Sequence, residues 1–369
     1  MLARGMAGSV SEAQRQCESE MEARLVFEPG FPARCSIRSD HAGTDWPEHL
    51  AMAREAIMDK LAAHGALVLR GALRKNRLGQ SDPERLEQVA SSLFQLAGKE
   101  IGGVEGTRRR KRVGNVNAPV SMSQLYKGPS ATKAERAAAV IWHQELAFFP
   151  PDLVPDALAL CCHELPESGG ATPLTLSSRL QRSLQGELGE IQSELGEILD
   201  GQGSFAAERR IPSDGAGAKG PAPTWQSLFD TDDRAAVALI CSERGWDLEW
   251  DEQHTATITM TQLPMHRAHP RTGELMWCNA VPPALRMWSK VTMASGRVLN
   301  KVRHVAELQQ AFVDSEPIEY AWTDETKDDI LLIDNYTAVH AGPVSWGGSR
   351  AMLQTYGWGY GTTPGSKGF

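Results

Sequence analysis

Short apolar runs separated by proline and glycine follow one another along most of the chain after about residue 112. Five of them, each four to six residues long, lie at 157–162, 255–260, 275–278, 330–333 and 352–356. Runs of this length bounded by turn residues are typical of the strands of an antiparallel sandwich or barrel. The sequence therefore predicts a β-rich core, with any helices packed outside it.

Helical patterns precede and interrupt these runs. A helix is expected over 46–64, where apolar residues recur on one face, and Gly65 can end it before a buried strand at 66–69. A second helix is expected to begin near Ser81, which forms a capping box with Glu84, and to end at Gly98. Leucine and isoleucine at every third or fourth position predict a third helix over 176–198.

These patterns indicate a single domain over 26–369, preceded by a polar N-terminal arm over 1–25. The segment 201–223 is rich in glycine, proline and alanine, has no periodic pattern of its own, and is predicted to be a loop or lid. Together with the helical repeat before it, this segment makes an expected lid or insert around 176–223.

Composition excludes several classes of protein. The 369 residues are 41% hydrophobic, which is enough for a large core and excludes wholesale disorder. A formal net charge of −8 argues against a nucleic-acid partner or a polybasic membrane anchor, and no apolar run approaches the roughly 20 residues that cross a bilayer. The six cysteines form no CxxC pair, and residues 1–22 lack the apolar stretch of a secretory signal, so we expect a cytoplasmic protein.

Three residues have the chemistry of a metal site. His143 and Glu145 would project from one face of an extended strand, and together they offer two adjacent ligands for a divalent metal. His340, which follows the apolar run 330–333, is the best candidate for the third ligand. Two histidines and one carboxylate form the facial triad that leaves open positions on Fe(II). A zinc hydrolase with a His2Glu site is the alternative from another enzyme class, although its usual spacings place the ligands on a helix.

Two further residues suit an organic anion. Arg350 lies ten residues after His340, and its planar guanidinium can bind a carboxylate through two hydrogen bonds. Thr172 follows a pair of glycines and offers a hydroxyl to the same carboxylate. Together they could hold the far carboxylate of a keto diacid chelated to the metal.

Several blocks of sequence occur in one order between about residues 61 and 357. They are GALVLRG at 65–71, WHQE at 142–145, PESGGATP at 166–173, TWQSLF at 224–229 and HPRTGELMWCN at 269–279, followed by His340 and Arg350. In this order the chain resembles the Fe(II)/2-oxoglutarate-dependent oxygenases of the taurine dioxygenase and clavaminate synthase group. The resemblance implies a mainly β fold with flanking α-helices around a double-stranded β-helix, or jelly-roll, core.

The resemblance also implies the cofactors and the roles of the site residues. His143, Glu145 and His340 would bind Fe(II), and Thr172 and Arg350 would bind the distal carboxylate of 2-oxoglutarate, with O2 as the oxidant. Halogenating relatives have a small residue in place of the carboxylate ligand, so halogenation is not expected here. Taurine dioxygenase has a second arginine for the sulfonate where this chain has Gln354, so taurine is not the expected substrate.

The implied reaction is oxidation of an unactivated C–H bond of a small molecule, with release of succinate and CO2. Hydroxylation of an amino acid or an amino-acid-derived metabolite, free or carrier-bound, is expected by analogy with secondary metabolism. Desaturation, epoxidation or cyclisation would use the same residues and are left open by the sequence. A non-catalytic binding module on a degenerate barrel is the remaining alternative.

Overall fold

The computed structural model describes residues 25–37, 46–73, 83–96, 112–113, 116–121, 142–147, 154–187, 203–213, 224–229, 231–277, 290–342, 346–347 and 351–360. Most of the predicted N-terminal arm, the second half of the helix predicted over 176–198, and Arg350 lie outside these residues. No helix in the described part of the chain is both long and apolar enough to span a membrane.

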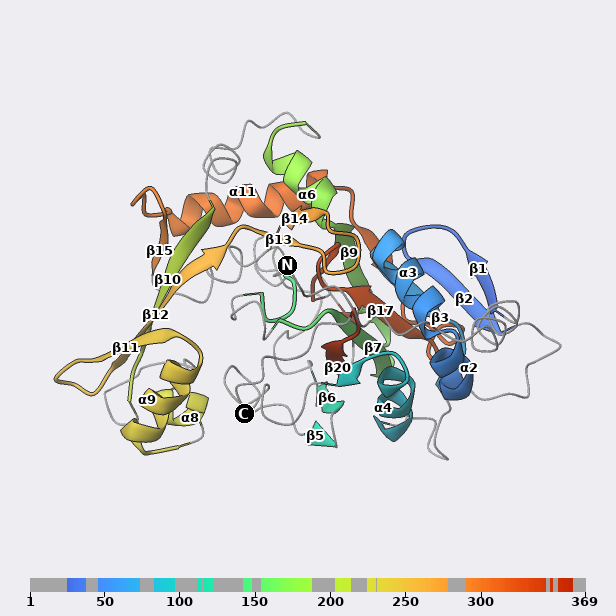
Figure 1. Ribbon diagram of the computed structural model, residues 1–369, viewed down its shortest axis with the longest axis horizontal. Coiled ribbons are helices and arrows are strands. Elements are labelled where there is room, and N and C mark those ends of the chain that lie inside the picture. Colours follow the sequence, from blue (N-terminus) through green and yellow to red (C-terminus); the bar gives the residue numbers. More distant parts are fainter. Residues whose placement is uncertain are drawn as a thin grey trace, which may run out of the picture.

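The largest sheet contains nine strands (Figure 1). Eight of them run in the order β1 (Leu25–Glu28), β2 (Ala33–Ile37), β3 (Ala66–Leu69), β17 (Ile330–Asp334), β7 (Ala157–Glu164), β20 (Ala351–Trp358), β6 (Val116–Ser121) and β5 (Arg112–Val113), and β4 (Gln95–Leu96) pairs with β20. The β2–β3 pair is parallel, and the other pairs of this sheet are antiparallel. The predicted strands at 66–69, 157–162, 330–333 and 352–356 are confirmed, and all belong to this sheet.

The central strands β3, β17 and β7 carry mostly apolar residues, because both faces of the sheet are covered there. Leu67 and Leu332 point to one side and pack against helices, whereas Val68 and Leu331 point to the other side and into a second core. Alternate residues of a strand face opposite sides, so each of these short runs contributes to two cores at once.

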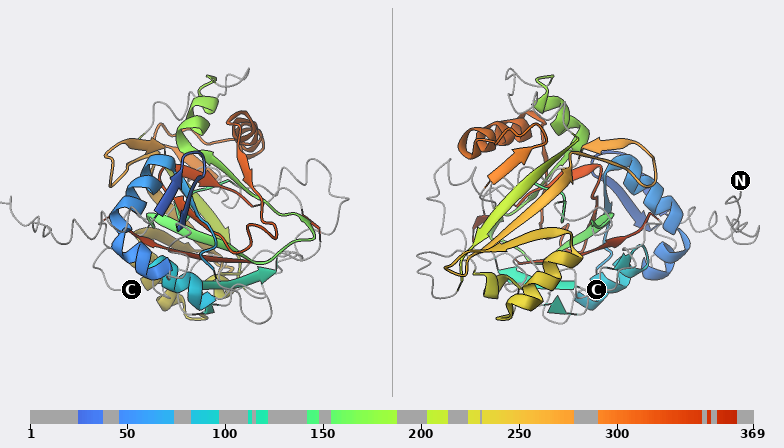
Figure 2. Two further views of the ribbon diagram at one scale, coloured as in Figure 1. Left: turned by 90° about the vertical axis from the view of Figure 1, so that its right-hand side faces the viewer. Right: turned by 60° about the vertical axis from the view of Figure 1, so that its left-hand side comes forward.

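Three helices cover the outer face of the large sheet (Figure 2). They are α2 (Trp46–Met52), α3 (Arg54–His64) and α4 (Pro83–Ser91). The single helix predicted over 46–64 is therefore divided at Ala53. Gly65 ends α3 as predicted, with a φ of 75° and its N–H donating to the carbonyl of Leu61. The second helix is shorter than predicted, since Leu96 already lies in β4.

The first of two small sheets covers the inner face of the large sheet. It contains β16 (Ile318–Tyr320), β9 (Thr172–Leu176) and β18 (Ala338–His340). The second small sheet pairs β8 (Ser168–Gly169) with β19 (Trp346–Gly347). Leu174, Tyr320 and Ala338 of the first small sheet pack with inner-face residues of the large sheet. Antiparallel strands on both sides of a shared core, with helices outside, confirm the predicted mainly β jelly-roll fold.

A four-stranded sheet extends from the jelly roll (Figure 1). Its strands are β11 (Trp246–Trp250), β12 (Ala256–Pro264), β10 (Ser204–Ile211) and β15 (Lys290–Met293). It shares a core with α6 (Ser177–Leu184), α8 (Trp225–Phe229), α9 (Arg234–Glu243) and α11 (Lys301–Asp314). A hairpin of β13 (His266–Ala268) and β14 (Leu275–Trp277) completes the described strands.

The predicted loop over 201–223 is wrong for Ser204–Ile211, which forms β10 at the centre of this sheet. Phe205, Ala207 and Ile211 are buried there, while their neighbours are more exposed. Small and charged residues between these apolar positions hide the alternation in the sequence. The predicted strand at 255–260 is confirmed as part of β12, and the one at 275–278 as β14 up to Trp277.

Candidate active site

The segment Trp142–Ala147 carries the HxE pair, but it does not form the predicted strand. His143 makes a single antiparallel bridge with His340, in which the two backbone N–H groups donate across the pair at 2.8 and 3.2 Å. A turn begins at Glu145, and Leu146 has a φ of 54°. The backbone that positions the pair is therefore a single β-bridge at His143 and a turn at Glu145.

The side chains of His143, Glu145 and His340 converge nonetheless. One ligand atom from each lies within 4.8 Å of the others. Glu145 Oε2 is 3.6 Å from His143 Nε2 and 3.8 Å from His340 Nε2, too far for hydrogen bonds. Donor atoms that are each about 2.1 Å from one ion lie roughly 3 to 3.4 Å apart, so the two Glu145–histidine distances are slightly longer than those expected around a bound ion. The donor set suits a divalent transition metal and leaves coordination positions open.

The bridge explains why two histidines so distant in sequence meet. His340 ends β18, and β18 pairs with β9 on its other side, so His143 attaches to the outer edge of this small sheet. Residues directly opposite each other in an antiparallel pair project from the same face. The two imidazole rings consequently lie with their centroids 4.4 Å apart.

A turn between β17 and β18 holds the backbone of the HxE segment. The buried side chain of Asn335 accepts from the Glu145 N–H at 2.7 Å and donates to the Glu145 carbonyl at 2.9 Å and the Pro155 carbonyl at 2.8 Å. The Gln144 side chain donates to the Tyr336 carbonyl at 2.7 Å. The Asn335 amide thus pairs with Glu145 as a neighbouring strand would.

Asp334, which is fully buried, fixes that turn in place. Its Oδ1 accepts from the N–H groups of Tyr336 and Thr337 at 2.8 and 2.7 Å. Its Oδ2 lies 2.9 Å from His269 Nε2 and also accepts from the Tyr360 hydroxyl. Burial and the neighbouring Asp334 raise the pKa of Tyr360, so the phenol remains a hydrogen-bond donor.

His269 has no predicted partner in the sequence, yet its side chain is buried. Its Nδ1 accepts from the N–H groups of Arg271 and Thr272, so the ring proton lies on Nε2 and is donated to Asp334. Arg271 in turn bonds to Asp59 and Glu55 of α3. The β13–β14 hairpin is therefore tied both to the helices outside the sheet and to the turn that positions Glu145.

Gln354 contacts the candidate carboxylate ligand directly. Its Nε2 donates to Glu145 Oε2 at 2.9 Å. The same oxygen atom faces the two imidazole nitrogens. From the sequence, Gln354 is notable only as the position where the resemblance to taurine dioxygenase would place a sulfonate-binding arginine.

Thr172 is the first residue of β9, on the strand that pairs with His340 through Leu174. It is buried, and the Trp322 indole N–H donates to its Oγ1 at 2.9 Å. Because an indole nitrogen can only donate, the hydroxyl is the acceptor in this bond, which limits where its own hydrogen points. Arg350, the other predicted 2-oxoglutarate residue, lies outside the described residues.

The sequence matches the family described as taurine catabolism dioxygenase TauD, TfdA family, over residues 28–356. The chain belongs to this TauD/TfdA family. Membership confirms the family predicted from the sequence, whose members are Fe(II)/2-oxoglutarate-dependent dioxygenases. Enzymes of the TauD/TfdA family depend on Fe(II), 2-oxoglutarate and O2, and the His143–Glu145–His340 group offers the donor atoms such an ion needs.

Individual relatives of this TauD/TfdA chain are distant. A clavaminate synthase-like protein of Arabidopsis thaliana is 25% identical over 195 residues, which cover 51% of this chain and 56% of that protein. The chain thus spans little more than half the length of this relative. A taurine dioxygenase from Burkholderia xenovorans has a similar structure with 15% identity and a TM-score of 0.46, covering 90% of this chain and 89% of that one. The PvcB protein of Pseudomonas aeruginosa has 14% identity and a TM-score of 0.47, covering 96% and 94%.

Proposed function

We propose that this chain oxidises an unactivated C–H bond of a small molecule at an iron held by His143, Glu145 and His340, with hydroxylation as the outcome. The convergence of the three ligand atoms within 4.8 Å carries the proposal. Bound iron would couple the decarboxylation of 2-oxoglutarate to succinate and CO2 with transfer of one oxygen atom of O2 to the substrate. The protein decides which C–H bond is presented.

Thr172 and Arg350 are the proposed partners of the distal carboxylate of 2-oxoglutarate. For Thr172, support comes from its place on β9, two residues from Leu174, which pairs with His340. The indole of Trp322 occupies an acceptor position of the hydroxyl, which favours donation by Thr172 to an anion. For Arg350, support comes from its guanidinium, which suits a carboxylate, and from its position directly before β20.

The proposed substrate is an amino acid or an amino-acid-derived metabolite, free or bound to a carrier. Gln354 is neutral, and its amide is engaged with Glu145, so this position supplies no cation for a sulfonate. This argues for a substrate other than taurine, even though a taurine dioxygenase is among the similar structures.

A zinc hydrolase is the competing function, since zinc accepts the same donor atoms. Its usual HExxH motif places both histidines on one helix. Here His143 lies in a bridge, Glu145 in a turn and His340 in a strand. This arrangement favours the open facial site of an iron oxygenase.

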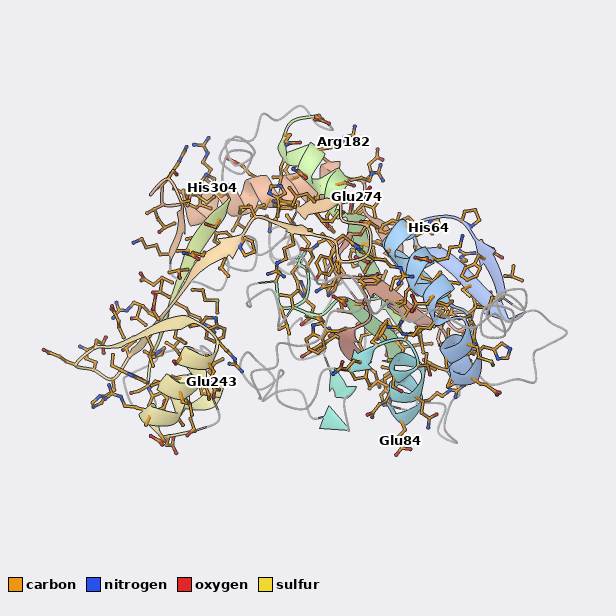
Figure 3. All side chains as sticks on the ribbon, viewed as in Figure 1. His64, Glu84, Arg182, Glu243, Glu274 and His304 are labelled. Carbon is orange, nitrogen blue, oxygen red and sulfur yellow. The ribbon has the colours of Figure 1, made fainter. Side chains whose placement is uncertain are left out.

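The test is an anaerobic titration of the full chain with Fe(II) and 2-oxoglutarate. We expect a weak visible charge-transfer band in the wild type, which His340→Ala abolishes. His64→Ala, at the end of α3 (Figure 3), is a matched histidine control that keeps the band. Absence of the band in the wild type, or its persistence in His340→Ala, would refute the iron assignment.

Once the band is established, a screen of free and carrier-bound amino acids identifies the substrate class. The readout is succinate formed above the rate seen without substrate. Mass spectrometry of the product separates hydroxylation from desaturation, epoxidation and cyclisation. If no amino acid of either form raises succinate above background while another class of small molecule does, the substrate proposal is wrong and the iron chemistry stands.

A further inference from the structure

Gln354 lies on the inner face of β20, in the middle of the large sheet. Its neighbour Leu353 faces outward into the core shared with the helices, whereas Met352 and Tyr356 pack on the inner side. Gln354 is thus a half-buried amide between apolar residues on the face that carries the candidate site. Such a position calls for a specific hydrogen-bond partner.

The local pairing of β20 is irregular at this residue. The register between β20 and β6 shifts between Met352 and Gln354, while β20 stays paired with β7, where Gln354 lies opposite Leu160. Shifts of this kind redirect side chains and are common beside active sites.

The partner of the amide is the oxygen atom that faces the metal position. Gln354 Nε2 donates to Glu145 Oε2 at 2.9 Å, and that oxygen lies 3.6 Å from His143 Nε2 and 3.8 Å from His340 Nε2. An ionised carboxylate only accepts hydrogen bonds, so the amide nitrogen rather than the amide oxygen faces it. The bond is charge-assisted on the acceptor side and therefore stronger than a neutral one.

We propose that Gln354 is the positioning residue of the carboxylate ligand: its amide selects Oε2 of Glu145 as the ligand atom and holds that atom beside the two histidines. The inference rests on the proposed iron site. Glu145 needs such a partner because it lies in a turn, where no regular strand pairing aligns its side chain. Asn335 bonds to the backbone of Glu145, whereas Gln354 bonds to its side-chain oxygen and so acts on the torsions of the glutamate side chain.

The neutrality of Gln354 is part of this role. A lysine or arginine at the same distance would form an ion pair with Glu145 and compete with the metal for the carboxylate charge. A glutamine directs the carboxylate without cancelling that charge, so the anionic ligand stays available to a dication. Outer partners of this kind typically contribute 10-fold to 100-fold to metal affinity.

The test uses the full chain, Co(II) alone as the probe, and the substitution Gln354→Leu, which keeps the size of the side chain and removes the donor. We expect the dissociation constant for Co(II) to rise about 10-fold or more. We also expect the visible d–d spectrum of bound Co(II) to change, because Glu145 no longer presents one fixed oxygen. Gln310→Leu on α11, where the amide is exposed and bonds to Asp314, is the matched control and should bind as the wild type.

Two results would overturn the inference. One is a Gln354→Leu protein with a Co(II) affinity within twofold of the wild type and the same spectrum. The other is a Gln354→Leu protein that binds Co(II) more weakly but gives the same spectrum when bound, and whose metal-free form melts at a lower temperature than the wild type. In that case, general destabilisation of the fold accounts for the weaker binding. The variants Glu145→Ala and His340→Ala distinguish failure of the proposed iron site from failure of the role of Gln354. If they bind Co(II) as the wild type does, the proposed iron site fails, whereas if they lose it and Gln354→Leu does not, only the role of Gln354 fails.

Discussion

Replacement of Asn335 tests how the fold positions Glu145, the candidate carboxylate ligand. The Asn335 amide makes three hydrogen bonds to backbone groups, two of them to Glu145 and one to Pro155. Its side chain is buried, and each such bond contributes about 1 kcal/mol net to stability. Asn335→Ala should therefore lower the free energy of unfolding by about 3 kcal/mol.

This loss converts into a measurable change of melting temperature. An unfolding entropy of about 2.1 cal/mol/K per residue gives about 0.8 kcal/mol/K for 369 residues, so the variant should melt about 4 °C lower. Asn335→Asp should lower the melting temperature more than Asn335→Ala does. It keeps the bond from the Glu145 N–H but turns a carboxylate oxygen toward two carbonyl groups.

The assay combines differential scanning calorimetry of the metal-free protein with Co(II) titration. The backbone of Glu145 loses its two hydrogen bonds to the Asn335 amide in the variant. We therefore expect Co(II) to bind about 10-fold more weakly, in addition to the lower melting temperature. Asn300→Ala is the matched control, since the Asn300 side chain caps α11 and accepts a hydrogen bond from the Arg303 N–H. This control should lower the free energy of unfolding by about 1 kcal/mol and leave Co(II) binding unchanged. An Asn335→Ala protein that melts within 1 °C of the wild type and binds Co(II) equally well would refute the reasoning.

Three further predictions concern other parts of the fold. Burial lowers the pKa of His304 on α11 (Figure 3), so the unfolded chain binds more protons near pH 6.5 and wild-type stability falls as the pH drops below about 6.5. His304→Leu should reduce the difference in melting temperature between pH 7.5 and 5.5. Gly65→Ala should destabilise by about 1 to 3 kcal/mol in chemical denaturation, because φ is 75° and a Cβ would lie 2.8 Å from Leu176 Cδ2. Trp322→Phe removes the indole donor to Thr172 and should raise the KM for 2-oxoglutarate about fivefold with little change in kcat, measured as succinate formation.

Much of the fold could be predicted from the sequence, because its central strands are buried on both faces. A short apolar run such as 330–333, bounded by polar and turn residues, is typical of a strand in the middle of a covered sheet, and β17 lies there. Ser204–Ile211 could not be identified in the same way. Its buried residues Phe205 and Ala207 alternate with small or charged ones, and the partners that make it a strand, β12 and β15, come much later in the chain.

In the candidate site, too, the features set by local sequence could be predicted and those set by tertiary contacts could not. The candidate ligands could be predicted in part, since His143 and Glu145 are only two residues apart. An HxE pair is common by chance, however, and the resemblance to the oxygenase family is what assigns His340 to the same site. The predicted strand for this pair is wrong, yet the side chains still converge, because the His143–His340 bridge supplies the alignment that a strand would have given. The residues that hold the ligands were not predictable: an asparagine in a turn is an ordinary turn residue until its 190-residue-distant contact with Glu145 is known. Local pattern therefore identifies the candidate metal ligands, and tertiary contacts from Asn335 and Gln354 determine how rigidly those side chains are held.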